Sequence, residues 1–204
     1  MQTINVTQLY DILYAKLGPR KWWPAQSTVQ LLCGAILIQN TNWRNVDRAL
    51  NLMEDQTHFG IGALLNLTTE QLQDLIRPSG FFRSKERYLR ALLTAYRDDF
   101  KGWRQLTTAD LRKQLRALPG IGNETADVLL LFVFRRPAFV ADTYTRRLFA
   151  ALGMPSKNYL DLQKQVDFNL PLVQAQEFHA LLDDYGKLGV DDFNLAATYQ
   201  LTSH

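Results

Sequence analysis

Apolar residues recur every three or four positions along almost the whole chain, and this spacing constrains the fold more than any other feature. In the segments 6–18, 84–100 and 107–118 it gives a helix one apolar and one polar face. The segments 27–40 and 123–134 are apolar nearly all round, which is typical of buried helices. We find no alternating pattern of useful length that would indicate a β-strand. The sequence therefore predicts an all-α fold with about ten helices and short loops.

Residues that start and stop helices support this interpretation. Ser27 or Thr28 is a suitable N-cap for the first buried helix. Thr68 or Thr69, followed by Glu and Gln, fits a capping box, and Pro78 stops the helix that follows. Further helices are predicted at 42–55, 68–78, 143–153, 160–170 and 175–189.

Composition limits the class of protein. The chain has 204 residues, 47% of them hydrophobic, which is enough for one sizeable core or two small ones. Its single cysteine, Cys33, cannot form an internal disulfide or a four-cysteine metal site, so a reducing cytoplasm is the simplest setting. No uncharged apolar stretch reaches the roughly 18 residues of a membrane-spanning helix. The N-terminal residues lack a basic start followed by an apolar block, so we expect no signal peptide.

Basic residues are concentrated in the middle of the chain. Residues 77–147 contain fifteen Lys and Arg against seven Asp and Glu, a balance of +8. The remaining residues contain eight and thirteen, a balance of −5. A concentrated positive field favours a polyanionic partner, with nucleic acid first, although a solvated arginine-rich surface would give the same count.

A segment rich in proline and glycine, Leu-Pro-Gly-Ile-Gly at 118–122, separates two of the predicted helices. Pro119 ends the first helix, and Gly120 and Gly122 permit backbone conformations that other residues avoid. The second helix begins near Asn123, so its first N–H groups are available to an anion such as a DNA phosphate. An ordinary helix–helix turn has the same composition, and both interpretations stay open on this motif alone.

An acidic residue, Asp142, follows the second buried helix in the sequence Val-Ala-Asp-Thr at 140–143. Aspartate is a preferred N-cap, so capping the next helix is the simpler interpretation. The spacing of Asp142 from the Leu-Pro-Gly-Ile-Gly segment suggests a second interpretation. That segment, the buried helix after it and Val-Ala-Asp-Thr at this distance together resemble the helix-hairpin-helix DNA glycosylases of the endonuclease III-like superfamily. The resemblance extends over residues 27–150 and more weakly to both ends.

Four segments resemble the 3-methyladenine DNA glycosylase branch of that superfamily. They are WWPA at 22–25, GAILIQNTNWRNVDRAL at 34–50, IRPSGFFRSKERYL at 76–89 and LPGIGNETADVLL at 118–130. The resemblance implies a monofunctional DNA glycosylase of base excision repair, which flips out an alkylated purine such as 3-methyladenine and hydrolyses its N-glycosidic bond. Two alternatives stay open: a glycosylase for a mismatched or oxidised base, and a non-catalytic helix-hairpin-helix DNA-binding protein.

Two departures from endonuclease III itself bear on the chemistry. Glu124 stands where that branch has a catalytic lysine, and a carboxylate cannot form an imine, so AP-lyase activity is not expected. The C-terminal residues lack the four cysteines of its iron–sulfur cluster, so no cluster is expected. We expect helix packing through Phe193, Leu195 and Tyr199 to order this tail. The resemblance implies no required cofactor and allows a monovalent cation at the hairpin carbonyls.

The resemblance also implies roles for individual residues. Asp142 would stabilise an oxocarbenium-like transition state and orient or deprotonate the attacking water. The residues expected around the flipped base are Trp22, Trp23, Pro24, Gln39, Trp43 and Lys187. Those expected to contact DNA are Asn40, Arg83, Lys85, Gly120, Ile121, Gly122, Asn123, Glu124, Thr125 and Arg146.

Each of these assignments has a structural alternative. Aromatic rings can stack on a flat cationic base, and stacking with cation–π attraction contributes roughly 0.5–2 kcal/mol per ring. Tryptophans are equally common as buried core residues. Gln39 and Asn40 are placed to contact the nucleotide or to cap their helix. The lysine and arginines are individually compatible with an ordinary solvated surface.

The resemblance implies two helical domains with a DNA-binding and catalytic cleft between them. Residues 26–136 would form a helical barrel domain that contains the helix-hairpin-helix motif. Residues 1–25 and 137–204 would form the second domain. We expect a monomer that binds double-stranded DNA containing a damaged base, has no membrane contact, and acts in the cytoplasm at the nucleoid.

Overall fold

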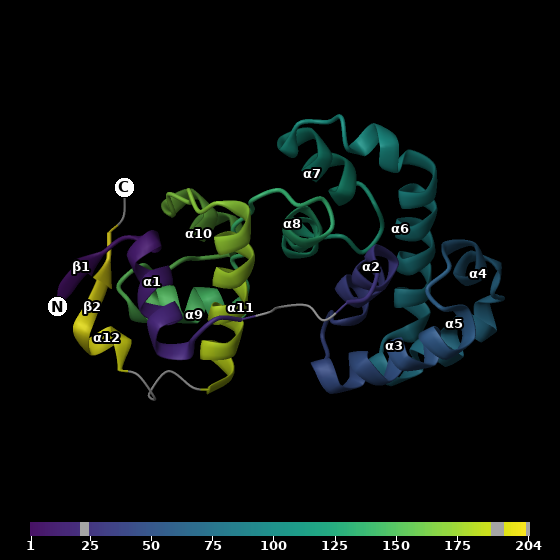
Figure 1. Cartoon of the computed structure of the whole chain (residues 1–204), viewed down its shortest axis with the longest axis horizontal. Coiled ribbons are helices and arrows are strands. Elements are labelled where there is room, and N and C mark those ends of the chain that lie inside the picture. The colour runs from purple at the N-terminus through teal and green to yellow at the C-terminus, as the bar shows by residue number, and fades with distance from the viewer. Residues whose placement is uncertain (21–24, 189–193, 203–204) are drawn as a thin grey trace. The chain divides into compact units, whose positions relative to one another are not determined.

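The fold is almost entirely helical (Figure 1). The computed structural model describes residues 1–20, 25–188 and 194–202. Within those ranges it has twelve α-helices, one short 3₁₀ helix and two three-residue strands. The predicted all-α class is therefore confirmed. None of the helices in these ranges combines the length and the apolar character that crossing a membrane requires.

The chain divides into two compact units. The terminal unit comprises the residues up to 24 and those from 135 onward, and the central unit comprises residues 25–134.

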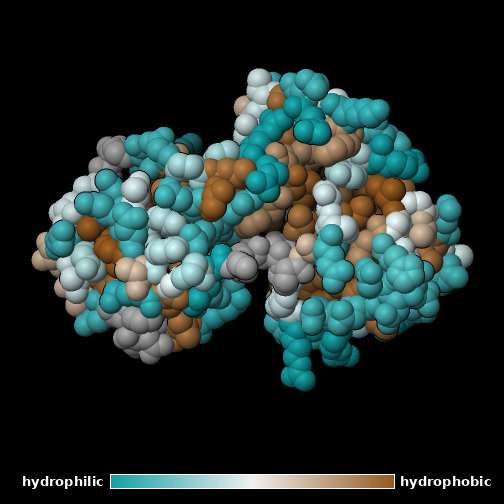
Figure 2. All heavy atoms as spheres, in the orientation of Figure 1, coloured by the Kyte–Doolittle hydropathy of each residue, from teal (hydrophilic) through white to brown (hydrophobic). Residues whose placement is uncertain are grey.

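The central unit is built around α2 (Thr28–Leu37), which is buried on nearly all sides. Its side chains Leu32, Cys33 and Ile36 have no exposed surface, because α2 packs against α3, α6 and α8 (Figure 1). The other elements of this unit are α3 (Trp43–Thr57), α4 (Ile61–Asn66), α5 (Thr69–Ile76), η1 (Arg77–Ser79), α6 (Phe82–Trp103), α7 (Thr108–Arg116) and α8 (Asn123–Phe132). On the face shown in Figure 2, hydrophilic side chains dominate the outer surfaces of α3, α5 and α7.

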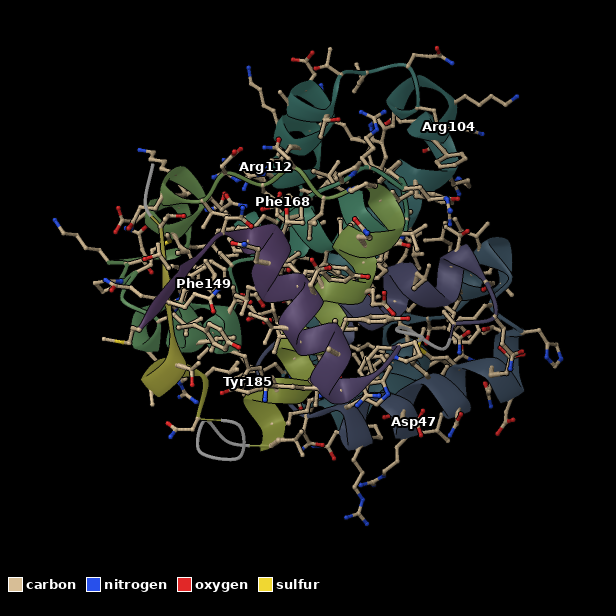
Figure 3. The ribbon with its side chains drawn as sticks, turned by 60° about the vertical axis from the view of Figure 1, so that its left-hand side comes forward. Asp47, Arg104, Arg112, Phe149, Phe168 and Tyr185 are labelled. Atoms are coloured by element: carbon tan, nitrogen blue, oxygen red, sulfur yellow. The ribbon has the colours of Figure 1, made fainter. Side chains whose placement is uncertain are left out.

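The terminal unit is centred on α11 (Leu172–Leu188), which packs against both α1 (Val6–Leu17) and α9 (Thr143–Ala151). The ring of Phe139 lies 5.5 Å from that of Phe149 and 5.3 Å from that of Phe168, between centroids. Figure 3 labels Phe149, Phe168 and Tyr185 among the side chains of this unit. Its other elements are β1 (Gln2–Ile4), α10 (Tyr159–Gln165), α12 (Leu195–Thr198) and β2 (Tyr199–Leu201).

The helix starts follow the capping signals in the sequence. The Ser27 side chain accepts a hydrogen bond from the N–H of Gln30 at 3.2 Å, so Ser27 is the cap of α2. Thr68 and Gln71 form both halves of a capping box at the start of α5. These two predictions are confirmed.

The C-terminal tail is ordered differently from the expectation. Strand β2 pairs in parallel with β1, with Ile4 opposite Leu201, and the N–H of Leu201 also donates to the carbonyl of Leu152 at 2.9 Å. Leu195 is buried, as expected, but Tyr199 belongs to the strand and not to a helix. The prediction of helix packing alone was therefore wrong. Phe193 lies outside the described residues.

Candidate functional site

A helical hairpin in the central unit is the candidate DNA-binding element. Helix α7 ends at Arg116 and α8 begins at Asn123, with Leu-Pro-Gly-Ile-Gly between them. Gly120 has a φ of 75°, and a Cβ there would lie 2.2 Å from a ring carbon of Tyr88 on α6. Only glycine fits this turn, because any side chain would be strained and would overlap that ring. The side chain of Ile121, within the same turn, is buried in the central unit.

Gly122 plays a different part from Gly120. It is the N-cap of α8, it is exposed, and a Cβ at this position would meet nothing within 4 Å. The N–H groups of the first turn of α8, which includes Asn123, Glu124 and Thr125, have no acceptor within the helix. A bare glycine in front of these groups leaves room for an anion to approach the backbone.

Two polar contacts hold the hairpin in place. The side-chain amide of Gln39 donates to the carbonyl of Gly120 at 3.0 Å and to the hydroxyl of Thr125 at 3.1 Å. The guanidinium of Arg112 on α7 binds the buried carboxylate of Asp127 on α8 with two hydrogen bonds, at 2.6 and 2.9 Å. The structure thus places the Gln39 amide on the hairpin, whereas the sequence predicted it for the base pocket.

Exposed basic side chains lie on α7, which forms one arm of the hairpin, and at the start of α6. Lys113 and Arg116 lie in the last turn of α7 and are exposed. Arg83 is also exposed, with its guanidinium 5.9 Å from the ring centroid of Phe82. The first two were not singled out from the sequence, where they look like any amphipathic helix surface.

Lys85 corrects the predicted DNA contacts. Its side chain is only 2% exposed, and its ammonium donates to the carbonyls of Leu37 and Ser79, both at 2.7 Å. It therefore joins the end of α2 to η1 from inside the central unit. The prediction that Lys85 contacts a phosphate from the surface was wrong, because the lysine meets backbone acceptors first.

Replacing Lys85 by Met should lower the free energy of unfolding by roughly 2–4 kcal/mol, because two buried carbonyls lose a charged donor. The matched control is Lys113→Met, which removes an exposed lysine and should change stability by less than about 0.5 kcal/mol. Denaturant unfolding of both variants measures the difference. Equal stability of the two would contradict the buried role of Lys85.

The same comparison should depend on pH. Burial lowers the pKa of Lys85 to about 8, below the roughly 10.4 of an unfolded lysine. Between these values the unfolded chain binds more protons than the folded chain, so the contribution of Lys85 to stability rises with pH. The stability difference between the wild type and Lys85→Met should therefore widen from pH 8 to pH 10.

Three further polar or aromatic residues of the central unit differ in how much they are exposed. Asn40 is exposed, with a φ of 52° that asparagine tolerates well. Trp43 is half-buried at the first position of α3. Phe81 is 67% exposed and has a φ of 49°, an unusual conformation for an aromatic residue. Sequence reasoning missed Phe81, because a Gly-Phe-Phe run gives no sign of which ring faces solvent.

The candidate catalytic residue, Asp142, lies in the terminal unit. This residue is half-buried and is the N-cap of α9, where its Oδ1 accepts a hydrogen bond from the N–H of Thr145 at 2.8 Å. The predicted capping role is therefore confirmed. The second carboxylate oxygen takes no part in the cap. A carboxylate whose position is fixed through one oxygen can use its other oxygen to accept a proton or to stabilise a positive charge.

Helix α11 runs directly beside the start of α9. A Cβ at Gly186 would lie 2.4 Å from ring carbons of Tyr144, so the Tyr144 ring rests on the bare backbone of α11. Asp142 precedes this contact by two residues. The close approach of the two helices brings the carboxylate next to the side chains that α11 presents on the same face.

Three titratable residues, His179, Asp183 and Lys187, follow one another along α11 at intervals of four and so share a face. The Lys187 ammonium forms an ion pair with the Asp183 carboxylate. Burial lowers the pKa of His179 and Lys187 adds to this effect, while the negative charges of Asp142 and Asp183 oppose it. The imidazole is therefore neutral at pH 7. Sequence reasoning named Lys187 but missed its partner and the histidine.

The remaining predicted residues divide between the described and the undescribed parts of the chain. Arg146, in the first turn of α9, is half-buried. Trp22, Trp23 and Pro24 lie outside the described residues. The described part of the chain holds no group of three or more His, Cys, Asp or Glu side chains placed to bind a metal ion. Cys33 is fully buried in α2, and burial raises the pKa of its thiol.

The glycine-containing hairpin between the packed helices α7 and α8 is characteristic of helix-hairpin-helix proteins. The aspartate at the start of α9 is a candidate catalytic acid. Comparison with known sequences also indicates a helix-hairpin-helix protein. Residues 33–172 match the family described as the HhH-GPD superfamily base excision DNA repair protein. The chain belongs to this superfamily.

Two relatives in sequence illustrate the match. A Methanocaldococcus jannaschii protein named "Putative DNA repair glycosylase MJ1434" is 34% identical over 191 residues, covering 89% of this chain and 87% of that protein. The endonuclease III of Sulfolobus acidocaldarius is 33% identical over 117 residues, covering 56% of this chain and 52% of that enzyme. The chain thus spans about half the length of this second relative.

Solved structures share the fold. One is the 3-methyladenine DNA glycosylase MagIII of H. pylori bound to 1,N6-ethenoadenine, with a TM-score of 0.75 and 21% identity, covering 91% of this chain and 98% of that one. Another is a non-covalent endonuclease III–DNA complex, with a TM-score of 0.75 and 20% identity, covering 92% and 86%. At this level of identity the likeness concerns the fold alone.

Proposed function

We propose that this protein is a monofunctional DNA glycosylase that removes alkylated purines such as 3-methyladenine from double-stranded DNA. The observation that carries the proposal is Asp142, a half-buried carboxylate that caps α9 through one oxygen only, in a chain of a base excision repair superfamily. The Methanocaldococcus jannaschii relative, named as a DNA repair glycosylase, supports the same activity.

Binding of DNA would begin at the hairpin. The N-terminal turn of α8 offers backbone donors behind Gly122, and Lys113 and Arg116 add positive charge at the end of α7. Phosphate contacts of this kind position a protein on DNA without reading its sequence. A repair enzyme needs such contacts, because a lesion occurs in every sequence context.

Base removal requires that the damaged nucleotide leaves the stack, since the N-glycosidic bond cannot be reached inside a duplex. As the bond breaks, positive charge develops on the sugar, and the Asp142 carboxylate would stabilise that charge and orient the attacking water. A purine alkylated at N3 or N7 already carries a formal positive charge and leaves readily. The protein then has little acid catalysis to supply, and Trp43 is a candidate for stacking on the cationic ring.

The absence of AP-lyase activity follows from Glu124 in this proposal. Glu124 is exposed in the first turn of α8, where the resemblance places the imine-forming lysine of other members of the superfamily. A carboxylate has no amine to attack the sugar. We further propose that the protein acts as a monomer at the nucleoid in the cytoplasm, without a bound cluster.

A lesion panel tests this function. Methylated DNA should release free 3-methyladenine, and the resulting abasic strand should stay intact until it is treated with alkali. Borohydride should trap no covalent complex. A trapped complex would refute the monofunctional assignment, and repeating the trapping with Lys187→Met would show whether that exposed amine is responsible. Release of only an oxidised or mismatched base would redirect the assignment to another lesion.

A further inference from the structure

The Asp183–Lys187 ion pair is not explained by the stability of α11. Lys187 has a side chain that is 52% exposed, whereas Asp183 is only 13% exposed. Exposed ion pairs of this spacing contribute about 0.3–0.5 kcal/mol to a helix. The low exposure of the Asp183 carboxylate sets this pair apart from an ordinary exposed surface pair and calls for another explanation.

The position of the Asp183–Lys187 pair suggests an explanation. The Tyr144–Gly186 contact holds the start of α9 against the stretch of α11 that ends in Lys187. Asp142, Asp183 and Lys187 all influence the charge of His179, so these groups share one electrostatic neighbourhood. With His179 neutral, the two carboxylates and the ammonium sum to a charge of −1. Without Asp183 the sum is zero, and a bare ammonium is left beside Asp142.

We propose that Asp183 determines specificity by neutralising Lys187, so that the surroundings of Asp142 accept a base that carries a formal positive charge. This inference rests on the function proposed above and names the substrate class of the same site: cationic, N-alkylated purines. An unpaired ammonium beside the reacting nucleoside would repel such a base and would oppose the positive charge that develops on the sugar. Asp183 acts through Lys187 and is therefore a positioning residue, not a catalytic one.

The size of the effect follows from Coulomb's law. Two like unit charges within about 10 Å of each other, at an effective dielectric constant of about 20, repel by an energy that corresponds to a tenfold or larger change in rate. A neutral base lacks the first of the two penalties. Affinity for a duplex that contains uncharged 1,N6-ethenoadenine should therefore change by less than about threefold.

The experiment compares four proteins on methylated DNA. Asp183→Asn should release 3-methyladenine and 7-methylguanine about tenfold more slowly than the wild type. Adding Lys187→Met to this variant removes the bare ammonium and should restore most of the loss. Asp184→Asn is the matched control: it removes the adjacent carboxylate, which pairs with Arg20 at 2.6 Å on another face of α11, and should leave the release rate unchanged.

The outcomes separate this inference from the proposed function. Release by the wild type with no loss in Asp183→Asn, or an equal loss in the double variant, overturns the specificity role and leaves the glycosylase function standing. A purely structural Asp183 would give that equal loss, because removing Lys187 cannot repair a misfolded helix. A wild type that releases no methylated base overturns the proposed function and this inference with it.

Discussion

Replacing Asp142 by Asn is expected to slow base release by roughly 10²–10⁴-fold while leaving the fold intact. Asparagine is as good an N-cap as aspartate, so the hydrogen bond to the N–H of Thr145 survives and α9 keeps its start. What disappears is the negative charge and the basic oxygen. The variant therefore separates the capping role of Asp142 from its proposed catalytic role.

The measurement is single-turnover release of 3-methyladenine from methylated DNA, with thermal unfolding recorded in parallel. Asp161→Asn serves as the control, because Asp161 is another carboxylate of the terminal unit that accepts a backbone N–H, from Lys157 at 2.7 Å. It should release base at the wild-type rate. If Asp142→Asn is as fast as this control, Asp142 is only a cap, and the chain is better described as a DNA-binding member of its superfamily.

Local features were predictable from the sequence because they depend on neighbours in the chain. The Ser27 cap, the Thr68 capping box and the cap by Asp142 all use residues within three positions of one another. The hairpin was predictable for the same reason, since Pro119 and the two glycines fix the turn locally. Burial of α2 was predictable because its apolar residues leave no polar face.

Features set by distant neighbours were not predictable. Lys85 lies in a charged helical segment that is typical of an exposed surface. Its ammonium is buried because it donates hydrogen bonds to the carbonyls of Leu37 and Ser79, which lie outside its own helix. Gln39 follows a buried helix, and its direction depends on the hairpin 81 residues away along the chain. The β1–β2 pairing joins residues from the two ends, and three-residue strands are too short to show an alternating pattern.

The same limit applied to the helices and to the candidate site. Helices α4 and α12 have six and four residues, fewer than two turns, so no periodicity can appear. For Asp183, the sequence shows a carboxylate four residues before a lysine, which is the commonest surface pattern of a helix. That spacing gives no sign that its side chain is only 13% exposed.

Gly120→Ala and Gly122→Ala should fail in different ways, although they alter the same loop. At Gly120 a methyl group would overlap the Tyr88 ring and impose a left-handed conformation on alanine, so we expect a loss of about 2–4 kcal/mol in unfolding free energy. At Gly122 the added methyl meets open space, and the loss should stay below about 1 kcal/mol.

For DNA affinity, the direct effect is expected from Gly122→Ala, the variant that changes stability less. Gly122→Ala places a methyl group in front of the donors of α8, and losing one charge-assisted backbone contact should weaken DNA affinity by about tenfold to a hundredfold. Fluorescence anisotropy with a labelled duplex, at fixed salt, measures this in a protein of near wild-type stability. Unchanged affinity in Gly122→Ala would remove the hairpin from the DNA interface. Wild-type stability in Gly120→Ala would instead show that Tyr88 moves aside, and that the hairpin is not held by close packing on α6.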